Sequence, residues 1–206
     1  LDYENSKIIT CHIGNGASIT AIKNGKSYDT SMGFTPVDGL IMGTRCGDID
    51  PGALIYIAEK EGLSYSKLSE LINKHSGVAG FTDISSDMRD IERAANNGDE
   101  RAALVLDMYD ERMRKYIGSY AAIMGGVDLI VFTGGVGENG PNRRRNTCAH
   151  MEYMGLIFDQ SANDGVKGED KILSAPESRV KVVVAATDEE LVIASDTFRL
   201  LKKRSE

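Results

Sequence analysis

A glycine-containing segment near the amino terminus has the composition of a phosphate-binding loop. Residues 11–18 read Cys-His-Ile-Gly-Asn-Gly-Ala-Ser, between two stretches of strand-like sequence. Gly14 and Gly16 carry no Cβ, so the backbone N–H groups of this segment could close on a phosphate chain. A hairpin turn that needs positive φ favours the same Gly-Asn-Gly sequence, and His12 on a strand is more often a core residue than a ligand. The segment is therefore compatible with a phosphate loop and with a purely structural turn.

A second glycine cluster follows an apolar strand later in the chain. Residues 133–139 read Thr-Gly-Gly-Val-Gly-Glu-Asn after the strand-like residues 128–132, and a helix is expected to start near Asn139. Phosphates often lie at such strand, loop and helix junctions, and small residues let a ribose or a flat ring approach the main chain. The spacing matches neither the Walker motif nor the dinucleotide fingerprint. Tight packing of the strand against the helix explains the same glycines.

Arg45 lies in a glycine-rich segment, residues 42–51, where its guanidinium could act on phosphate. Arginine presents five donors in a rigid fork that suits phosphoryl oxygens, and it neutralises the charge of a phosphoryl group in transfer. The alternative is an ion pair with Asp48 or Asp50. Asp50 precedes Pro51 and already suits the N-cap of a helix, whereas Asp48 has no assigned role.

Acidic residues near the carboxy terminus are candidates for holding Mg²⁺. Asp188 and Glu189 fall in the first turn of the last predicted helix, where the helix dipole favours carboxylates whatever the function, but a carboxylate there could also hold Mg²⁺ through water. Thr187 and Glu190 have the spacing of a capping box. Residues 87–89, Asp-Met-Arg, similarly form either a helix cap or an edge that contacts a nucleoside.

The elements that must position these residues predict a mixed sheet. Residues 8–13, 18–22 and 27–32 read as antiparallel strands, with Asn24-Gly25 as a hairpin turn, and residues 128–132 and 180–185 as later strands joined through helices. Such an order predicts an α/β fold with a mixed sheet and helices on both faces. Residues 159–178 are polar and read as a surface excursion.

Helices are expected from Pro51 to Gly62, over 65–73, from Ser86 or Asp87 to Ala95, over 100–124, and after Thr187. In the 100–124 helix, apolar residues recur every three or four positions on one face: Leu106, Tyr109, Met113, Tyr116, Tyr120 and Met124. In the last helix, Leu191, Ala194 and Phe198 share a face. The run Arg143–Arg145 reads as a solvated helix face.

Composition narrows the class of protein. The 206 residues carry 24 Lys and Arg against 31 Asp and Glu, a net charge of −7 that is spread along the chain rather than gathered into tails, so neither nucleic acid nor an anionic membrane is an expected partner. The three cysteines are far apart and lack metal-type spacing, which favours a reducing compartment. We expect one acidic, cytoplasmic domain that spans residues 1–206.

Five of these segments, in order along the chain, resemble acetate kinase, and the resemblance runs from about residue 8 to residue 200. The matching segments are His12–Gly16, residues 43–45 with 47–51, residues 86–87 with 89–90, residues 132–135 with 137–139, and Thr187 with Glu189-Glu190.

The resemblance implies a fold and a role for each segment. Acetate kinases belong to the superfamily of sugar kinases, actin and heat-shock chaperones, which have two ribonuclease H-like domains around a cleft, and this chain resembles the carboxy-terminal domain. The resemblance implies that the ATP phosphates lie along His12, Ile13, Gly14, Asn15 and Gly16. It implies that the adenosine part is held by Asp87, Met88, Arg89, Gly135, Val136, Gly137, Glu138 and Asn139. Arg45 would be the catalytic arginine, and Glu189 would bind Mg²⁺ or Mn²⁺, with Asp188 as the alternative ligand.

The chain departs from the family in two ways. Met88 stands where the family often has phenylalanine beside the adenine, which keeps apolar contact without ring stacking, and Cys46 stands where serine is common. The segments of the amino-terminal domain that act on the acyl phosphate are absent. We therefore expect a chain that binds ATP or ADP, forms the homodimer typical of the family, and does not transfer phosphate to acetate alone.

Two rival functions remain open on the sequence. A propionate or butyrate kinase would share the chemistry and differ in the acyl pocket. An actin-like or chaperone-like nucleotide switch would use the same fold for conformational signalling, and a dimerisation role could accompany either. The Gly-Thr-Arg-x-Gly-Asp segment around Arg45 favours a kinase.

Overall fold

The computed structural model describes residues 2–205, apart from the side chains of Glu189 and of residues 203–205. Within that part of the chain, six strands form one sheet in the order β3-β2-β1-β4-β6-β5. Their bounds are β1 Lys7–Ile13, β2 Ala17–Lys23, β3 Lys26–Thr30, β4 Leu129–Thr133, β5 Lys171–Ile172 and β6 Lys181–Val184.

The sheet is mixed, as the order of the elements predicts. The first three strands are antiparallel neighbours, β4 lies parallel to β1, and β6 lies parallel to β4. The β2–β3 turn explains part of this: Asn24 and Gly25 have φ values of 53° and 72°, as a two-residue hairpin with a right-handed strand twist requires. The predicted α/β class with a mixed sheet is confirmed.

Helices connect and cover the strands, and their predicted caps are largely confirmed. Asp50 and Asp87 each accept a hydrogen bond from a backbone N–H of the helix that follows, from Gly52 at 2.6 Å and from Arg89 at 2.9 Å. The α-helices are α1 Pro51–Lys60, α2 Tyr65–Lys74, α3 Gly77–Thr82, α4 Met88–Asn96, α5 Glu100–Met124, α6 Gly134–Asn139, α7 Pro141–Cys148, α8 Gln160–Asn163 and α9 Glu189–Ser205, with short 3₁₀ helices at Tyr3–Asn5 and Glu152–Met154.

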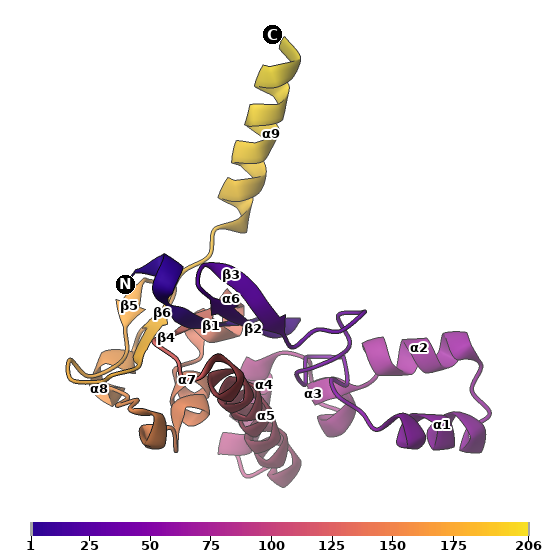
Figure 1. Cartoon of the computed structure of the whole chain (residues 1–206). Coiled ribbons are helices and arrows are strands. Elements are labelled where there is room, and N and C mark those ends of the chain that lie inside the picture. The colour runs from indigo at the N-terminus through magenta and orange to yellow at the C-terminus, as the bar shows by residue number, and fades with distance from the viewer. Residues whose placement is uncertain (1, 206) are drawn as a thin grey trace.

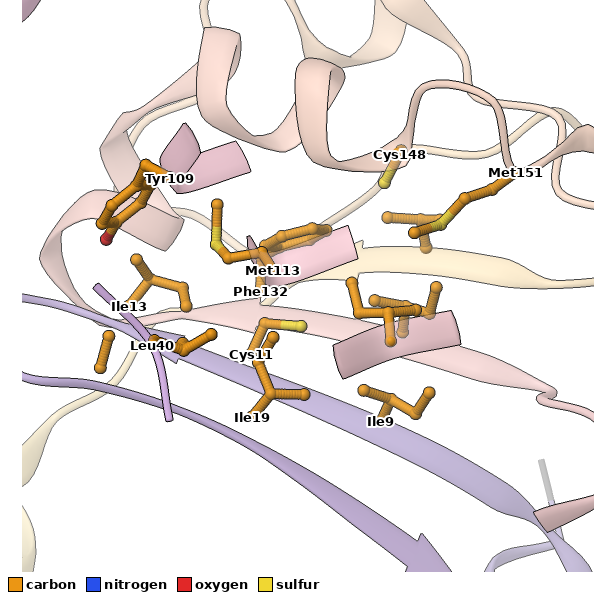
Figure 2. Packing of buried hydrophobic residues seen from close by; sticks show 14 of the residues in the cluster. Ile9, Cys11, Ile13, Ile19, Leu40, Tyr109, Met113, Phe132, Cys148 and Met151 are labelled. Carbon is orange, nitrogen blue, oxygen red and sulfur yellow. The ribbon is translucent and has the colours of Figure 1, made fainter. Parts of the chain in front are cut away.

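The core lies between one face of the sheet and α5. Alternate residues of β1, among them Ile9 and Cys11, are fully buried, and they meet Tyr109 and Met113 of α5 together with Phe132 of β4 (Figure 2). In Figure 1, α4, α5 and α7 lie on this side of the sheet, whereas α9 projects away on the other. No helix within residues 2–205 is long and apolar enough to cross a membrane.

The arginine run on α7 is not a solvated face, contrary to the expectation from its charge. Arg143 is 6% exposed and Arg144 is fully buried, and only Arg145 is exposed. Arg143 donates to Asp110 at 2.6 Å and to Glu92 at 3.0 Å. α7 has eight residues and packs against α5, so one side of the helix must be buried. Two arginines occupy this side, Arg143 with its ion pairs and Arg144 with hydrogen bonds to carbonyl and amide oxygens.

The last helix does not pack its apolar face on the rest of the described chain. Leu191 is 60% exposed and Phe198 is 70% exposed, and Figure 1 shows α9 standing clear of the sheet. The predicted capping box is also wrong, because Asp188 caps the helix by accepting from the Leu191 amide at 2.8 Å. The Thr187 hydroxyl donates elsewhere, to Glu138.

The polar segment 159–178 is anchored in the core and is more than a surface excursion. Val166 and Leu173 are buried, and Asn163 is fully buried. The Asn163 side chain accepts from Arg144 at 2.9 Å and donates to the Pro141 carbonyl at 3.1 Å. Two buried apolar side chains and one amide therefore hold a segment whose composition is otherwise that of a loop.

Candidate functional site

Four segments that are distant in sequence meet beside the carboxyl ends of β1 and β4. The Gly43 amide donates to the Asn15 carbonyl at 3.1 Å, and a Cβ on Gly43 would collide with the Asn15 side chain and touch Ser86. A Cβ on Gly134 would lie 2.9 Å from the Ile13 carbonyl oxygen. The segments that contain residues 13–16, 43–45, 86–89 and 134–139 are therefore in contact, as a shared ligand would require.

A large pocket opens between these segments. Its volume is about 1030 Å³, which is at the upper end of the range for small-molecule sites. Eight residues that the sequence predicts for nucleotide binding line it: Gly14, Asn15, Asp87, Met88, Arg89, Gly135, Val136 and Asn139.

A smaller pocket adjoins the large one at Gly135. Its volume is about 370 Å³, and its lining is His12, Gly134, Gly135, Thr187, Asp188 and Glu190. His12 and the acidic start of α9 thus face one space, next to the glycine cluster. The side chain of Glu189, the predicted metal ligand, lies outside the described part of the structure.

The second glycine cluster forms a helix rather than the expected loop. α6 begins at Gly134, directly after β4, and Gly134 has φ = +78° against the Ile13 backbone. Only glycine adopts this conformation so close to another backbone segment without strain. Gly135 differs, because a Cβ there would meet no atom within 4 Å. One glycine therefore serves strand-to-helix packing, and the next leaves open space in the pocket.

Glu138 lines neither pocket. Its Oε1 accepts from the Gly134 amide at 3.0 Å, from the Thr187 amide at 3.0 Å and from the Thr187 hydroxyl at 2.7 Å. Burial opposes ionisation of this carboxyl, but the hydrogen bonds from Thr187 and Gly134 outweigh it, so the pKa of Glu138 is lowered. The carboxylate is engaged within the protein.

Arg45 is not paired with either candidate aspartate. Asp48 pairs with Arg112 at 3.1 Å, and Asp50 caps α1. Among the described residues, Arg45 makes no ion pair; its Nη1 lies 3.7 Å from the Met42 sulfur, and 3.2 Å from a Cβ placed on Gly16. The guanidinium therefore lies beside the first glycine segment with its charge uncompensated, and the ion-pair interpretation is wrong.

Asp48, which had no assigned role, fastens the Arg45 segment to α5. Its carboxylate accepts from the Gly39 amide at 2.8 Å and from the Tyr116 hydroxyl at 3.0 Å, and Arg112 donates to the Gly39 carbonyl at 2.9 Å. Tyr116 lies 68 positions away along the chain, so no local pattern could have indicated this contact.

Residues 87–89 act as a cap and also line the pocket. Arg89 donates to the Asp87 carboxylate at 2.5 Å, and these side-chain hydrogen bonds, with the Arg89 amide, lower the pKa of Asp87 to about 2. Met88 is buried at 8% exposed and forms an apolar part of the pocket wall. The cap interpretation and the pocket interpretation are therefore compatible.

The remaining predicted residues have different environments. The Ile13 side chain is in the core at 1% exposed, so that only its backbone is near the site. A Cβ placed on Gly137 would meet the Phe132 and Cys11 backbones at ordinary contact distances, and Gly137 lines neither pocket.

Part of the large pocket is formed by residues that their sequence context does not mark as ligand-binding. Tyr109, Glu92 and Arg143 line it, and the Tyr109 hydroxyl is buried without a hydrogen-bond partner among the described residues. Tyr109 was expected on the buried face of its helix, which it is. Periodicity identifies the buried face of a helix but does not show which buried residues border a cavity.

Comparison with known proteins agrees with this geometry. The sequence pattern of the Acetokinase family matches residues 1–195. An acetate kinase of Porphyromonas gingivalis strain W83 is 59% identical over 202 residues, which cover 98% of this chain and 51% of that protein.

Solved structures give the same result. The crystal structure of Porphyromonas gingivalis acetate kinase superposes with a TM-score of 0.93 at 58% identity, covering 98% of this chain and 50% of that one. A propionate kinase from Francisella tularensis superposes with a TM-score of 0.84 at 39% identity, covering 93% and 48% of the two chains. The chain thus spans about half the length of the relatives it matches, and it belongs to the Acetokinase family.

Proposed function

We propose that this chain is the nucleotide-binding half of an acetate kinase, which transfers a phosphoryl group reversibly between ATP and acetate. The observation that carries the proposal is the position of Arg45, a half-buried guanidinium without a carboxylate partner among the described residues, beside Gly16. An uncompensated arginine next to a glycine loop suits a phosphoryl group in transfer better than it suits a packing contact.

The large pocket would hold the nucleotide. Its volume and its shared lining by Asn15, Met88 and Val136 support a placement with the nucleoside between residues 87–89 and α6. The phosphates would then run along the backbone of residues 12–16 toward Arg45. Gly135, whose Cβ position is open, would allow the ligand to approach the main chain of α6.

Mg²⁺ would be held at the smaller pocket. No cluster of three metal-ligating side chains exists among the described residues, but Mg²⁺ commonly takes one or two carboxylates and completes its shell with water and phosphate oxygens. Asp188 lines the pocket beside His12 and Glu189 follows it in sequence, so the donor set fits. The bound ion would neutralise charge on the phosphates, and Arg45 would stabilise the phosphoryl oxygens during in-line attack by the acetate oxygen.

The acceptor side of the reaction would be supplied by the other half of the enzyme. Because this chain spans about half of its relatives, we propose that it binds nucleotide but does not complete the transfer alone. The complete enzyme is expected to be a cytoplasmic homodimer. Propionate is the alternative acyl substrate, supported by the similarity to the propionate kinase, because the phosphoryl chemistry would be unchanged.

An acetyl phosphate assay tests this division of labour. The chain alone, with Mg²⁺ATP and acetate or propionate, should produce no acyl phosphate, whereas the chain mixed with the amino-terminal half of the Porphyromonas gingivalis relative should. Arg45→Ala in the mixture is the control and should abolish the product. Turnover by the chain alone, or turnover that survives Arg45→Ala, would contradict the proposal.

A further inference from the structure

One buried carboxylate links the start of α6 to the residue that precedes the capping position of α9. Glu138 is 9% exposed, and its Oε1 receives hydrogen bonds from Gly134 and from both the amide and the hydroxyl of Thr187, with the Thr133 hydroxyl at 3.5 Å. An acceptor with this many donors fixes the relative position of the two segments more firmly than a single hydrogen bond can.

Both segments line the smaller pocket. Gly134 and Gly135 line it from α6, and Thr187, Asp188 and Glu190 line it from the start of α9. Glu138 lines neither pocket. Its carboxylate therefore joins Gly134 and Thr187, two residues of the pocket lining, without being part of the lining itself.

The start of α9 depends on few other contacts. After β6, the Ala185 amide donates to the Phe132 carbonyl at 2.9 Å and the Ala186 amide to Asp170 at 2.8 Å. Thr187 is held by Glu138, and every residue of α9 whose side chain is described is exposed. The Glu138–Thr187 hydrogen bonds are thus the last anchor before the acidic turn.

We propose that Glu138 is a positioning residue that acts through Thr187, holding the acidic turn 188–190 against Gly134 and Gly135 so that Mg²⁺ and the nucleotide phosphates bind together. The identity of the ligand in this proposal rests on the proposed function. The anchoring of Thr187 by Glu138 rests on the hydrogen-bond geometry alone. It differs from the role that the resemblance implies for Glu138, which is direct contact with adenosine.

The chemistry of the pair makes the proposal specific. Oε1 of Glu138 faces hydrogen-bond donors only, so this position requires an oxygen. Glutamine can place its oxygen there, but a neutral amide oxygen accepts more weakly than a carboxylate oxygen, and the NH₂ group replaces Oε2. Serine at position 187 would keep both the amide and the hydroxyl donors. Valine would keep the shape and the amide but would remove the hydroxyl.

Calorimetric titration with ADP, with and without Mg²⁺, tests the consequence for binding. In Glu138→Gln and Thr187→Val, the tightening of ADP binding by Mg²⁺ should fall by about tenfold, while the Mg²⁺-free affinity stays unchanged. Thr187→Ser and the exposed control Glu152→Gln should behave as wild type, and the double variant should be no worse than Glu138→Gln. A loss of Mg²⁺-free affinity equal to the loss with Mg²⁺ would overturn the positioning role.

Amide hydrogen exchange tests the anchor without nucleotide, so the two proposals can fail separately. Exchange over residues 187–191 should be faster in Glu138→Gln and in Thr187→Val than in wild type, and unchanged in Glu152→Gln. Equal exchange in wild type and Glu138→Gln would refute the anchor, even if ADP binds. Absence of ADP binding to the wild type with an intact exchange difference would refute the proposed function instead.

Discussion

For single residues, the hydrogen-bond and ion-pair partners of a charged group show whether it has a structural role or is available to a ligand. Asp48, Asp50 and Asp87 all have carboxylates engaged in caps or ion pairs. Arg45 lies among them without such a partner in the described chain. An unpaired arginine near a predicted phosphate loop is therefore the most informative residue of the site.

Replacement of Arg45 should affect turnover far more than stability. In the assay with both halves, Arg45→Lys is expected to lower kcat by about 10³-fold or more, because lysine lacks the planar fork that contacts several phosphoryl oxygens. Thermal unfolding of the variant should match the wild type, since no ion pair is lost. A variant with near-normal kcat would show that Arg45 is not the catalytic arginine.

The lowered pKa of Glu138 predicts a particular dependence of stability on pH. Because the folded pKa lies below the ordinary value of 4.5, the ionised carboxylate stabilises the fold above about pH 4.5, and this stabilisation is lost as the pH falls through the folded pKa. Urea unfolding of wild type and Glu138→Gln should therefore differ most at neutral pH and converge once the pH has fallen below the folded pKa. A difference that grows in acid would contradict the assignment.

Arg144 should be a strong determinant of stability although it is charged. It is fully buried and donates to the Gly137 and Glu138 carbonyls at 2.8 Å, and to the Asn163 side chain at 2.9 Å. Arg144→Lys should lower the free energy of unfolding by about 2–4 kcal/mol, because lysine cannot reach all of these acceptors. Arg145→Lys, on the exposed side of the same helix, should change it by less than about 0.5 kcal/mol; equal effects in urea unfolding would refute the distinction.

Residue types and spacing alone predicted several loops of the site but not their supports. Gly14, Met88 and Gly135 line the large pocket as the sequence suggested. Two contacts that support neighbouring segments come from distant residues: the Tyr116 hydroxyl donates to Asp48 near Arg45, and Arg144 donates to the Val166 carbonyl. A sequence shows that a residue can ionise, but not which buried acceptor it will meet.

At the scale of elements, strands and long helices were predictable because their hydrophobic period is strong. The helix expected over 100–124 is α5, with the predicted bounds. α6 was predicted as a loop because three of its six residues are glycine, which disfavours helix in isolation. Hydrogen bonds from Arg144 to the Gly137 and Glu138 carbonyls compensate at its carboxyl end.

The periodic pattern of α9 predicted a helix correctly but not what it packs against. Phe198→Gln should therefore change the unfolding free energy of this chain by less than about 0.5 kcal/mol. Met113→Ala in α5, at 2% exposed, should cost about 2–5 kcal/mol. Denaturation curves of the two variants give the comparison, and a large effect of Phe198→Gln would mean that α9 packs on this chain in solution.

At the scale of the whole molecule, the sheet brings together loops that lie more than a hundred positions apart. The parallel pairing of β1 with β4 aligns Cys11 with Phe132 and His12 with Thr133, so that the two glycine segments emerge side by side. The order of elements predicted this mixed sheet, and the resemblance predicted the family. The side-chain contacts that hold these loops in place, such as the hydrogen bond from Tyr116 to Asp48, can be identified only in the folded structure.

We expect ADP to occupy the large pocket against Gly135. Calorimetric titration with Mg²⁺ADP of the wild type, of Gly135→Leu and of the control Gly118→Ala examines this placement. A Cβ at position 135 would meet no protein atom within 4 Å, so a leucine there would fill the pocket without disturbing the fold. We predict saturable binding to the wild type and to Gly118→Ala, and loss of binding to Gly135→Leu with unchanged thermal stability. Equal binding to all three proteins would contradict the placement of the nucleotide.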